Sequence, residues 1–137
     1  MDELTPQAVN EMVAVAFPGS QVRCSELGEG YAIASRKAGA DDIRPGGFIS
    51  GPSQFAIADS ALWFLVFTAL GRIEPMALTS ELSIRYLRPA TGEELHARAE
   101  LAASNRRSVV GSVVVWTDDP VRPTAIAQGT YSLPLPR

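Results

Sequence analysis

The stretch GGFISGPSQFAIADSALWFLVF (46–67) passes from a loop rich in glycine and proline into a long apolar run. From Pro52 to about Leu70 it has no strong turn residue, and Ala, Leu and Phe dominate, which predicts a helix of about five turns. Pro52 suits the first turn because proline has no amide to leave unpaired there. The run 61–70 is far shorter than the roughly 20 apolar residues of a bilayer span. We therefore expect a buried helix that carries one carboxylate, Asp59.

The segments on either side of this helix show helical spacing first and strand alternation later. A helix is expected over 5–17, with Thr5 as its N-cap and Pro18-Gly19 as its stop. The charged, glycine-rich stretch 40–47 is expected to be a loop. The predicted strands are 21–27 and 31–38, which form a hairpin, and then 77–89, 94–104, 108–118 and 124–134.

The order of these elements indicates an α+β fold in which one antiparallel sheet wraps the long helix. A helix that is apolar nearly all round must be covered on more than one side, by a second copy or by another layer of the same chain. Strict alternation in the strand 77–89 places Leu78, Leu82, Ile84 and Tyr86 on one face, and Thr79, Glu81, Ser83 and Arg85 on the other.

Composition limits the classes of function. The chain has 137 residues, of which 46% are hydrophobic and 20% charged, as expected for one globular domain over 1–137. The net charge of −3 gives no general attraction for nucleic acid or an anionic membrane. The single cysteine, Cys24, excludes an internal disulfide, and scattered acids with one histidine predict no metal site. The acidic N-terminal stretch is unlike a signal peptide, so we expect a cytoplasmic protein.

The start of the long helix resembles the hotdog-fold acyl-CoA thioesterases, and within them the group related to the phenylacetic-acid-degradation thioesterase. The signature of that group is His-Gly-Gly, four residues, then Leu-Ala-Asp and Ser/Thr-Ala. The matching positions are Ser-Gly-Pro at 50–52 and Ile-Ala-Asp-Ser-Ala at 57–61. The stretches 84–101 and 125–133 resemble the later strands, so the resemblance spans roughly 28–133. It implies the hotdog fold, an antiparallel sheet wrapped around one central helix.

The resemblance also implies roles for three residues. Asp59 matches the catalytic carboxylate, which acts as general base or nucleophile; Gly51 matches the glycine whose N–H polarises the thioester carbonyl; Thr79 matches an assisting hydroxyl. The chain departs from the signature where it has Ser50 for the histidine, Pro52 for the second glycine, and Arg44 for an asparagine about six residues upstream.

Helix geometry adds a constraint that the signature does not contain. Thioester hydrolysis needs a group that activates water and N–H donors aimed at the developing oxyanion. The helix start offers Gly51 and Ser53, because Pro52 has no N–H. Eight residues of α-helix rise about 12 Å, so Asp59 and Gly51 of one chain cannot both touch one thioester. If the chemistry is right, each site takes its acid and its oxyanion donor from different subunits of a two-fold dimer.

The remaining candidates have two interpretations each. Trp63 either lines an acyl pocket or belongs to the core, and three arginines either bind the phosphates of coenzyme A or are solvated. The serines at the helix start could contact substrate, but Ser50 is better explained as a cap than as a nucleophile. The only histidine, His96, lies on a polar strand face, so no Ser-His-Asp triad can be built. The candidate substrate-binding residues are Ser50, Ser53, Trp63, Arg88, Arg106 and Arg107.

These observations together predict an acyl-CoA thioesterase for a small or medium acyl group, working without metal or cofactor. We expect a homodimer or a dimer of dimers, that is, a homotetramer. A non-catalytic acyl-CoA- or lipid-binding hotdog protein is the main alternative, because the histidine and asparagine are missing. A hotdog hydratase is disfavoured, because such enzymes usually pair a histidine with an acid and this chain has only His96. A purely structural scaffold would leave the acid in the helix without a purpose.

Overall fold

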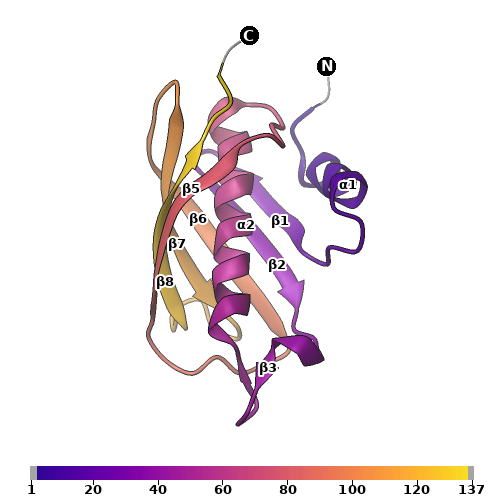
Figure 1. Cartoon of the computed structure of the whole chain (residues 1–137), viewed down its shortest axis with the longest axis vertical. Helices are drawn as coiled ribbons and strands as arrows, with labels where there is room; N and C mark the ends of the chain where they lie inside the picture. The colour runs from indigo at the N-terminus through magenta and orange to yellow at the C-terminus, as the bar shows by residue number, and fades with distance from the viewer. Residues whose placement is uncertain (1–2, 136–137) are drawn as a thin grey trace.

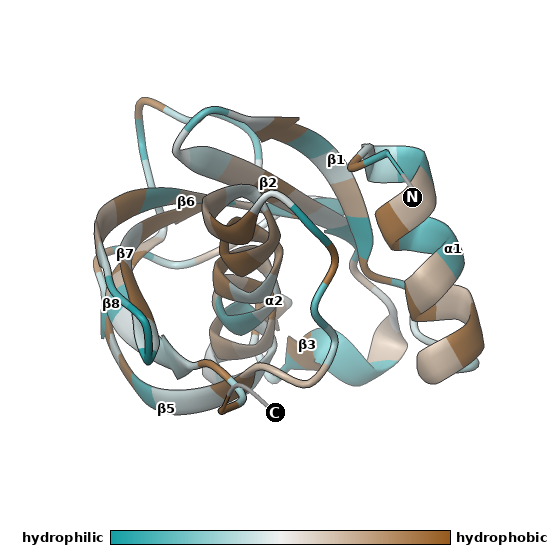
Figure 2. Ribbon diagram, turned by 90° about the horizontal axis from the view of Figure 1, so that it is seen from above, coloured by the Kyte–Doolittle hydropathy of each residue, from teal (hydrophilic) through white to brown (hydrophobic). Residues whose placement is uncertain are grey.

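The computed structural model describes residues 3–135, so both ends of the predicted domain 1–137 lie outside the described residues. Its main feature is α2 (Gly51–Leu70), which runs along one face of a six-stranded antiparallel sheet (Figure 1). The sheet curls around α2, as the view along the helix shows (Figure 2). The strands, in their order across the sheet, are β1 (Arg23–Gly28), β2 (Tyr31–Lys37), β6 (Glu94–Ser104), β7 (Ser108–Trp116), β8 (Ala125–Ser132) and β5 (Leu78–Tyr86). This is the predicted hotdog architecture, and the α+β prediction is confirmed.

The predicted long helix is present and begins one residue before Pro52. Its N-cap is Ser50, whose Oγ accepts the Ser53 N–H at 3.2 Å. It ends at Gly71, where φ is +74°, the left-handed conformation that glycine adopts readily. By length and mean hydropathy, 1.4, α2 could cross a membrane, but the sheet covers much of it.

Two facing glycines allow α2 to lie close to the sheet. Gly111 of β7 pairs with Gly129 of β8, and a Cβ on Gly129 would stand 2.8 Å from Leu62 Cδ1. A Cβ on Gly111 would stand 2.6 Å from Leu65 Cδ2. Contacts that short do not occur, so the glycines fix the height and rotation of the helix over β7 and β8.

One stripe of α2 is left uncovered by the rest of the chain. It has the helical spacing of a single face and contains both apolar and polar side chains. Phe55 on this stripe is 38% exposed although it is a large apolar residue. The half-buried or exposed residues of the stripe are Pro52, Phe55, Ala56, Asp59, Ser60 and Trp63. The sequence predicted that α2 needs covering on more than one side, and this stripe is the part that the sheet leaves for a second covering layer.

A short N-terminal helix, α1 (Pro6–Ala16), packs beside β1 at one edge of the sheet (Figure 1). Thr5 is its N-cap as predicted, accepting the Ala8 N–H at 3.1 Å. Asn10 fixes the helix to the strand, because its side chain donates to the Cys24 carbonyl at 3.0 Å and accepts the Cys24 N–H at 2.7 Å. The predicted hairpin that begins with this strand is confirmed as β1 and β2.

The predicted loop 40–47 is more ordered than expected. It contains a 3-10 turn (η1, Ala40–Asp42) and the first of two short paired strands, β3 (Ile43–Arg44) and β4 (Phe48–Ile49). The expectation of a plain loop was wrong because it depended on local composition. The segment is ordered by side-chain contacts that composition does not show, since Asp42 pairs with Arg36 of β2 and accepts from Ser53 of α2.

The predicted alternation in β5 was also wrong at one end. The register against β8 shifts between Thr79 and Glu81, so one extra residue is inserted there. Such a bulge rotates the strand by one position. Thr79 pairs with the inward-facing Tyr131, and Leu82 pairs with the buried Gly129. Thr79 therefore shares the inner face with Leu82, instead of facing the opposite way.

Candidate active site

Asp59 lies on the uncovered stripe of α2, and two hydroxyl groups hold one of its carboxylate oxygens. Thr79 Oγ1 donates to Asp59 Oδ1 at 2.6 Å, and Tyr131 Oη donates to the same atom at 2.8 Å. Within residues 3–135, Oδ2 has no hydrogen-bond partner. The carboxylate is thus oriented by one oxygen and leaves the other available for chemistry.

Tyr131 is a site residue that the sequence analysis missed. It is 4% exposed, and burial raises the pKa of its phenol, so the group remains a proton donor. Its Oη also lies 3.1 Å from the Asp59 backbone carbonyl. The only available signal was its place in the closing strand, which says nothing about its contact with a residue 72 positions away.

A pocket of about 350 Å³ opens beside Asp59. Trp63, one turn further along α2, lines it and also packs against the core, with its ring 5.2 Å from that of Phe67. Trp63 therefore lines the pocket and also contacts the core, while its contact with an acyl group stays a prediction. The pocket brings together Asp59, Thr79, Trp63 and Tyr131, and residues of the N-terminal segment also line it.

Gly51 lies at the first position of α2, in a different hollow from Asp59. Its N–H makes no hydrogen bond within the described part of the chain, while the Ser53 N–H is already bonded to the Ser50 cap. The expectation that Ser53 could also donate is therefore wrong for this structure. Tyr86 Oη donates to the Gly51 carbonyl at 2.7 Å. A Cβ on Gly51 would lie 3.0 Å from Tyr86 Oη. The missing side chain of Gly51 makes room for Tyr86.

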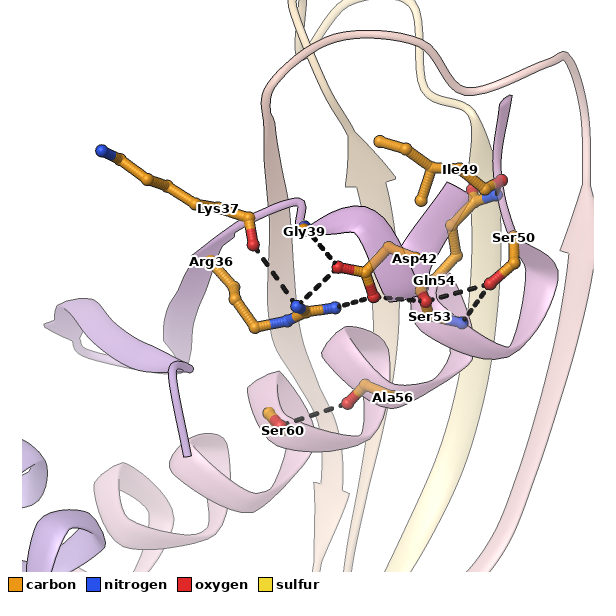
Figure 3. Close-up of polar contacts among 10 residues, drawn as sticks. All are labelled: Arg36, Lys37, Gly39, Asp42, Ile49, Ser50, Ser53, Gln54, Ala56 and Ser60. Carbon is orange, nitrogen blue, oxygen red and sulfur yellow. Dashed lines mark hydrogen bonds and ion pairs between the residues drawn. The ribbon is translucent and has the colours of Figure 1, made fainter. Parts of the chain in front are cut away.

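An ion pair fixes the segment that leads into Gly51 (Figure 3). Arg36 binds both carboxylate oxygens of Asp42, at 2.7 and 2.9 Å, and holds the pKa of that carboxyl far below its ordinary value. Asp42 Oδ1 also accepts from Ser53 Oγ at 2.6 Å, and Ser53 Oγ in turn accepts from Ser50 Oγ at 2.9 Å. The two predicted serines thus contribute to a fixed helix start. Asp42 was not among the predicted site residues.

The structure separates the predicted arginines. Arg88 lines the hollow of about 730 Å³ that contains Gly51, and its guanidinium donates to the Pro123 carbonyl. Arg106 lines another hollow beside Leu70, at the opposite end of α2. Arg107 belongs to the same strand turn, where its N–H donates to Asn105 Oδ1 at 2.8 Å.

His96 lies away from both hollows. Its Nδ1 is 2.8 Å from Ser35 Oγ, and its ring stacks on Trp116 at 5.4 Å. The histidine is half-buried rather than solvated, and its partners are structural. Within residues 3–135, no three His, Cys, Asp or Glu side chains lie close enough together to hold a metal ion.

A comparison of the sequence with models of protein families identifies the family. The family model described as the thioesterase superfamily matches residues 46–124. The chain belongs to the thioesterase superfamily. The matched span contains Gly51, Asp59 and Thr79 but ends before Tyr131. Membership of this superfamily supports thioester hydrolysis as the general activity.

Several solved structures share the fold. A candidate thioesterase from Silicibacter sp. TM1040 is 29% identical, with a TM-score of 0.83 over 96% of this chain and 92% of that one. A thioesterase from Haemophilus influenzae is 19% identical, with a TM-score of 0.79 over 96% and 91%. A variant of the phenylacetic acid degradation protein PaaI from Thermus thermophilus is 22% identical, with a TM-score of 0.71 over 90% and 99%. The last two show the fold alone. A search of curated protein sequences finds no significant match.

Proposed function

We propose that this thioesterase hydrolyses acyl-CoA as a homodimer, with Asp59 of one subunit and the Gly51 N–H of the other at each site. The observation that carries the proposal is the split arrangement. Among the described residues 3–135, a carboxylate with one free oxygen and a backbone N–H without a partner lie in separate hollows. Neither hollow alone contains both groups that thioester hydrolysis needs.

The chemistry follows from the free oxygen of Asp59. As a general base, Oδ2 takes a proton from water while the water oxygen attacks the thioester carbonyl carbon. The C–S bond then breaks, and the thiolate of coenzyme A leaves and takes up a proton. As a nucleophile, Oδ2 would attack the carbon itself and form an anhydride that water then opens. In both routes the Oδ1 contacts from Thr79 and Tyr131 aim the carboxylate.

The Gly51 N–H would stabilise the oxyanion that forms in either route. It lies at the positive end of the dipole of a 20-residue helix. The next residue, Pro52, has no N–H that could compete with it for the oxyanion. Tyr86 and the Asp42 ion pair hold the backbone around it. A fixed donor is more effective than a mobile one, because it needs no reorganisation during the reaction.

The uncovered stripe of α2 supports the dimer. A second copy that covered Phe55 and Trp63 would also bring its own helix start to the neighbourhood of Asp59. Arg88, beside Gly51, is the arginine best placed for the coenzyme A phosphates. Binding of coenzyme A by Arg106 and Arg107, assembly into a dimer of dimers, and a cytoplasmic location remain predictions.

Release of free thiol from a panel of acyl-CoA thioesters tests the activity. Asp59→Asn should lower kcat about 10²- to 10⁴-fold, the usual contribution of a general base, while the protein stays folded. Asp118→Asn is the matched control, because it makes the same change at an exposed carboxylate that lines neither hollow. Wild-type turnover by the Asp59 variant would remove that residue from the mechanism. Saturable acyl-CoA binding without thiol release would favour the non-catalytic alternative.

A further inference from the structure

The N-terminal segment forms the far wall of the Asp59 pocket. Most of the residues that line the pocket are apolar, and Ser20 is the one polar residue that the N-terminal segment contributes. Its apolar lining includes Val13, Phe17, Val22, Trp63, Pro75 and Leu78. Three of these six come from α1 and the turn after it, which the superfamily match at 46–124 does not include.

Phe17 closes the pocket against Trp63. The two rings meet edge to face with their centroids 5.6 Å apart. Phe17 directly follows the last residue of α1 and is 54% exposed, so its ring stands at the outer side of the pocket. Trp63 is four residues after Asp59, about 6 Å along the helix. An acyl chain that runs along this face from the carboxylate therefore meets the Phe17–Trp63 pair.

This wall is held in place rather than loosely attached. Val9 and Val13 of α1 are 0% and 3% exposed, so the helix has its own buried contacts. The two hydrogen bonds between Asn10 and Cys24 fix its distance from β1. A fixed wall can select among acyl groups by size, whereas a mobile one would adapt to each of them.

The charge of the lining residues is a second property that selects among acyl groups. No arginine or lysine lines the pocket among residues 3–135, and Asp59 is its only carboxylate. An acyl group with its own carboxylate would be desolvated there without a cationic partner and repelled by Asp59.

We propose that the pocket accepts uncharged, apolar acyl groups of short to medium length, and that Phe17 sets the upper limit of that length. The inference rests on the proposed thioesterase function, because it takes Asp59 to mark the position of the thioester. The volume of about 350 Å³ is at the lower end of ligand pockets, as expected for such a group. Phe17 acts here on specificity and takes no part in the chemistry.

The test is kcat/KM for saturated acyl-CoA thioesters from acetyl to dodecanoyl, for the wild type and Phe17→Ala. For the wild type, each methylene that enters the pocket should raise kcat/KM about four-fold until the wall is reached. Phe17→Ala should move the optimum to longer chains, with a relative gain of about ten-fold or more for the longest. Asn10→Ala should broaden the profile in the same direction, because it loosens the wall.

Val15→Ala is the matched control, because Val15 is also on α1, is 82% exposed and does not line the pocket. Its profile should equal that of the wild type. Butyryl- and succinyl-CoA have equal carbon counts, so their ratio tests the charge criterion, and butyryl should be favoured by about 100-fold or more. An unchanged optimum in Phe17→Ala, or efficient hydrolysis of succinyl-CoA, would overturn the proposal.

The proposal can fail separately from the proposed function. If no thioester is hydrolysed, the function is wrong, and the same series is then measured as binding by calorimetry. A binding optimum that moves to longer chains in Phe17→Ala would still support the length limit. Binding that is independent of chain length in both proteins would refute it.

Discussion

The split site predicts that two inactive variants restore each other. In Asp59→Asn every site lacks its acid. In Gly51→Pro every site lacks its oxyanion N–H, and proline is tolerated at the first position of a helix. The nearest atom to an added Cβ is the hydroxyl oxygen of Tyr86, 3.0 Å away, at the end of a side chain that is 48% exposed and can move. Both variants should therefore fold.

The expected size of the recovery follows from symmetry. Alone, the acid variant should lose about 10²- to 10⁴-fold in kcat and the glycine variant about 10²- to 10³-fold. In a mixed dimer, one site receives the intact Asp59 and the intact Gly51, and the other receives both changes. Random assembly makes about half of the dimers mixed, so activity should return to about one quarter of the wild-type value.

The assay is thiol release from equimolar co-expressed variants, compared with each variant purified alone. Co-expression of two copies of the Asp59→Asn variant, each with a different tag, controls for effects of co-expression. The reasoning would be refuted if tandem purification gave mixed dimers that are folded, bind acyl-CoA and remain as inactive as the parents. That result would mean that one chain completes its own site, against the separation of about 12 Å along α2.

Further predictions concern the groups that support the site. Tyr131→Phe and Thr79→Val should each lower kcat about ten-fold with little change in KM, as stopped-flow or steady-state thiol release can measure, because each removes one contact to the catalytic carboxylate. Gly129→Ala should lower the free energy of unfolding by about 1–3 kcal/mol in a denaturant titration, because its methyl group would overlap a core leucine. Asp42→Asn should lower the free energy of unfolding by about 2 kcal/mol at neutral pH in the same titration. Because Arg36 lowers the pKa of Asp42 from 3.8, that carboxylate stabilises the fold above about pH 4, so the difference from wild type should shrink as the pH falls further.

The features predicted correctly from the sequence are those that local pattern determines. Period and capping residues located α2 within one residue, because Ser50, Pro52 and Gly71 act within a single turn of the backbone. The antiparallel strands followed from the period-two alternation after that helix. The same pattern placed Asp59 and Gly51 eight residues apart on one helix, which fixes their separation along its axis, while the catalytic role of Asp59 stays a prediction.

The features that were missed depend on contacts between distant segments. The bulge that turns Thr79 inward is specified by the register of β5 against β8, which no local alternation reveals. Tyr131 meets Asp59 only because the last strand lies beside α2. Arg36 and Asp42 are only six residues apart, but their pairing needs β2 and the 3-10 turn to be in place, and it orders a segment whose composition alone is typical of a loop. Each of these is fixed by tertiary structure, and each lies next to one half of the proposed site.

The split site also fixes how two copies would meet. If Gly51 of one α2 faces Asp59 of the other across a two-fold axis, the two helices run antiparallel and the axis passes near the residue midway between them, Phe55. That residue is 38% exposed on the uncovered stripe, where an apolar contact with its own copy would explain it. Phe55→Asp should then dissociate the dimer, since two like charges would meet at the axis, while an acid in the first turns of a helix does not harm the monomer. Sedimentation should show monomers, and thiol release should fall with the dimer fraction. A fully active, dimeric Phe55→Asp protein would place the axis elsewhere and would separate the assembly from the geometry proposed for the site.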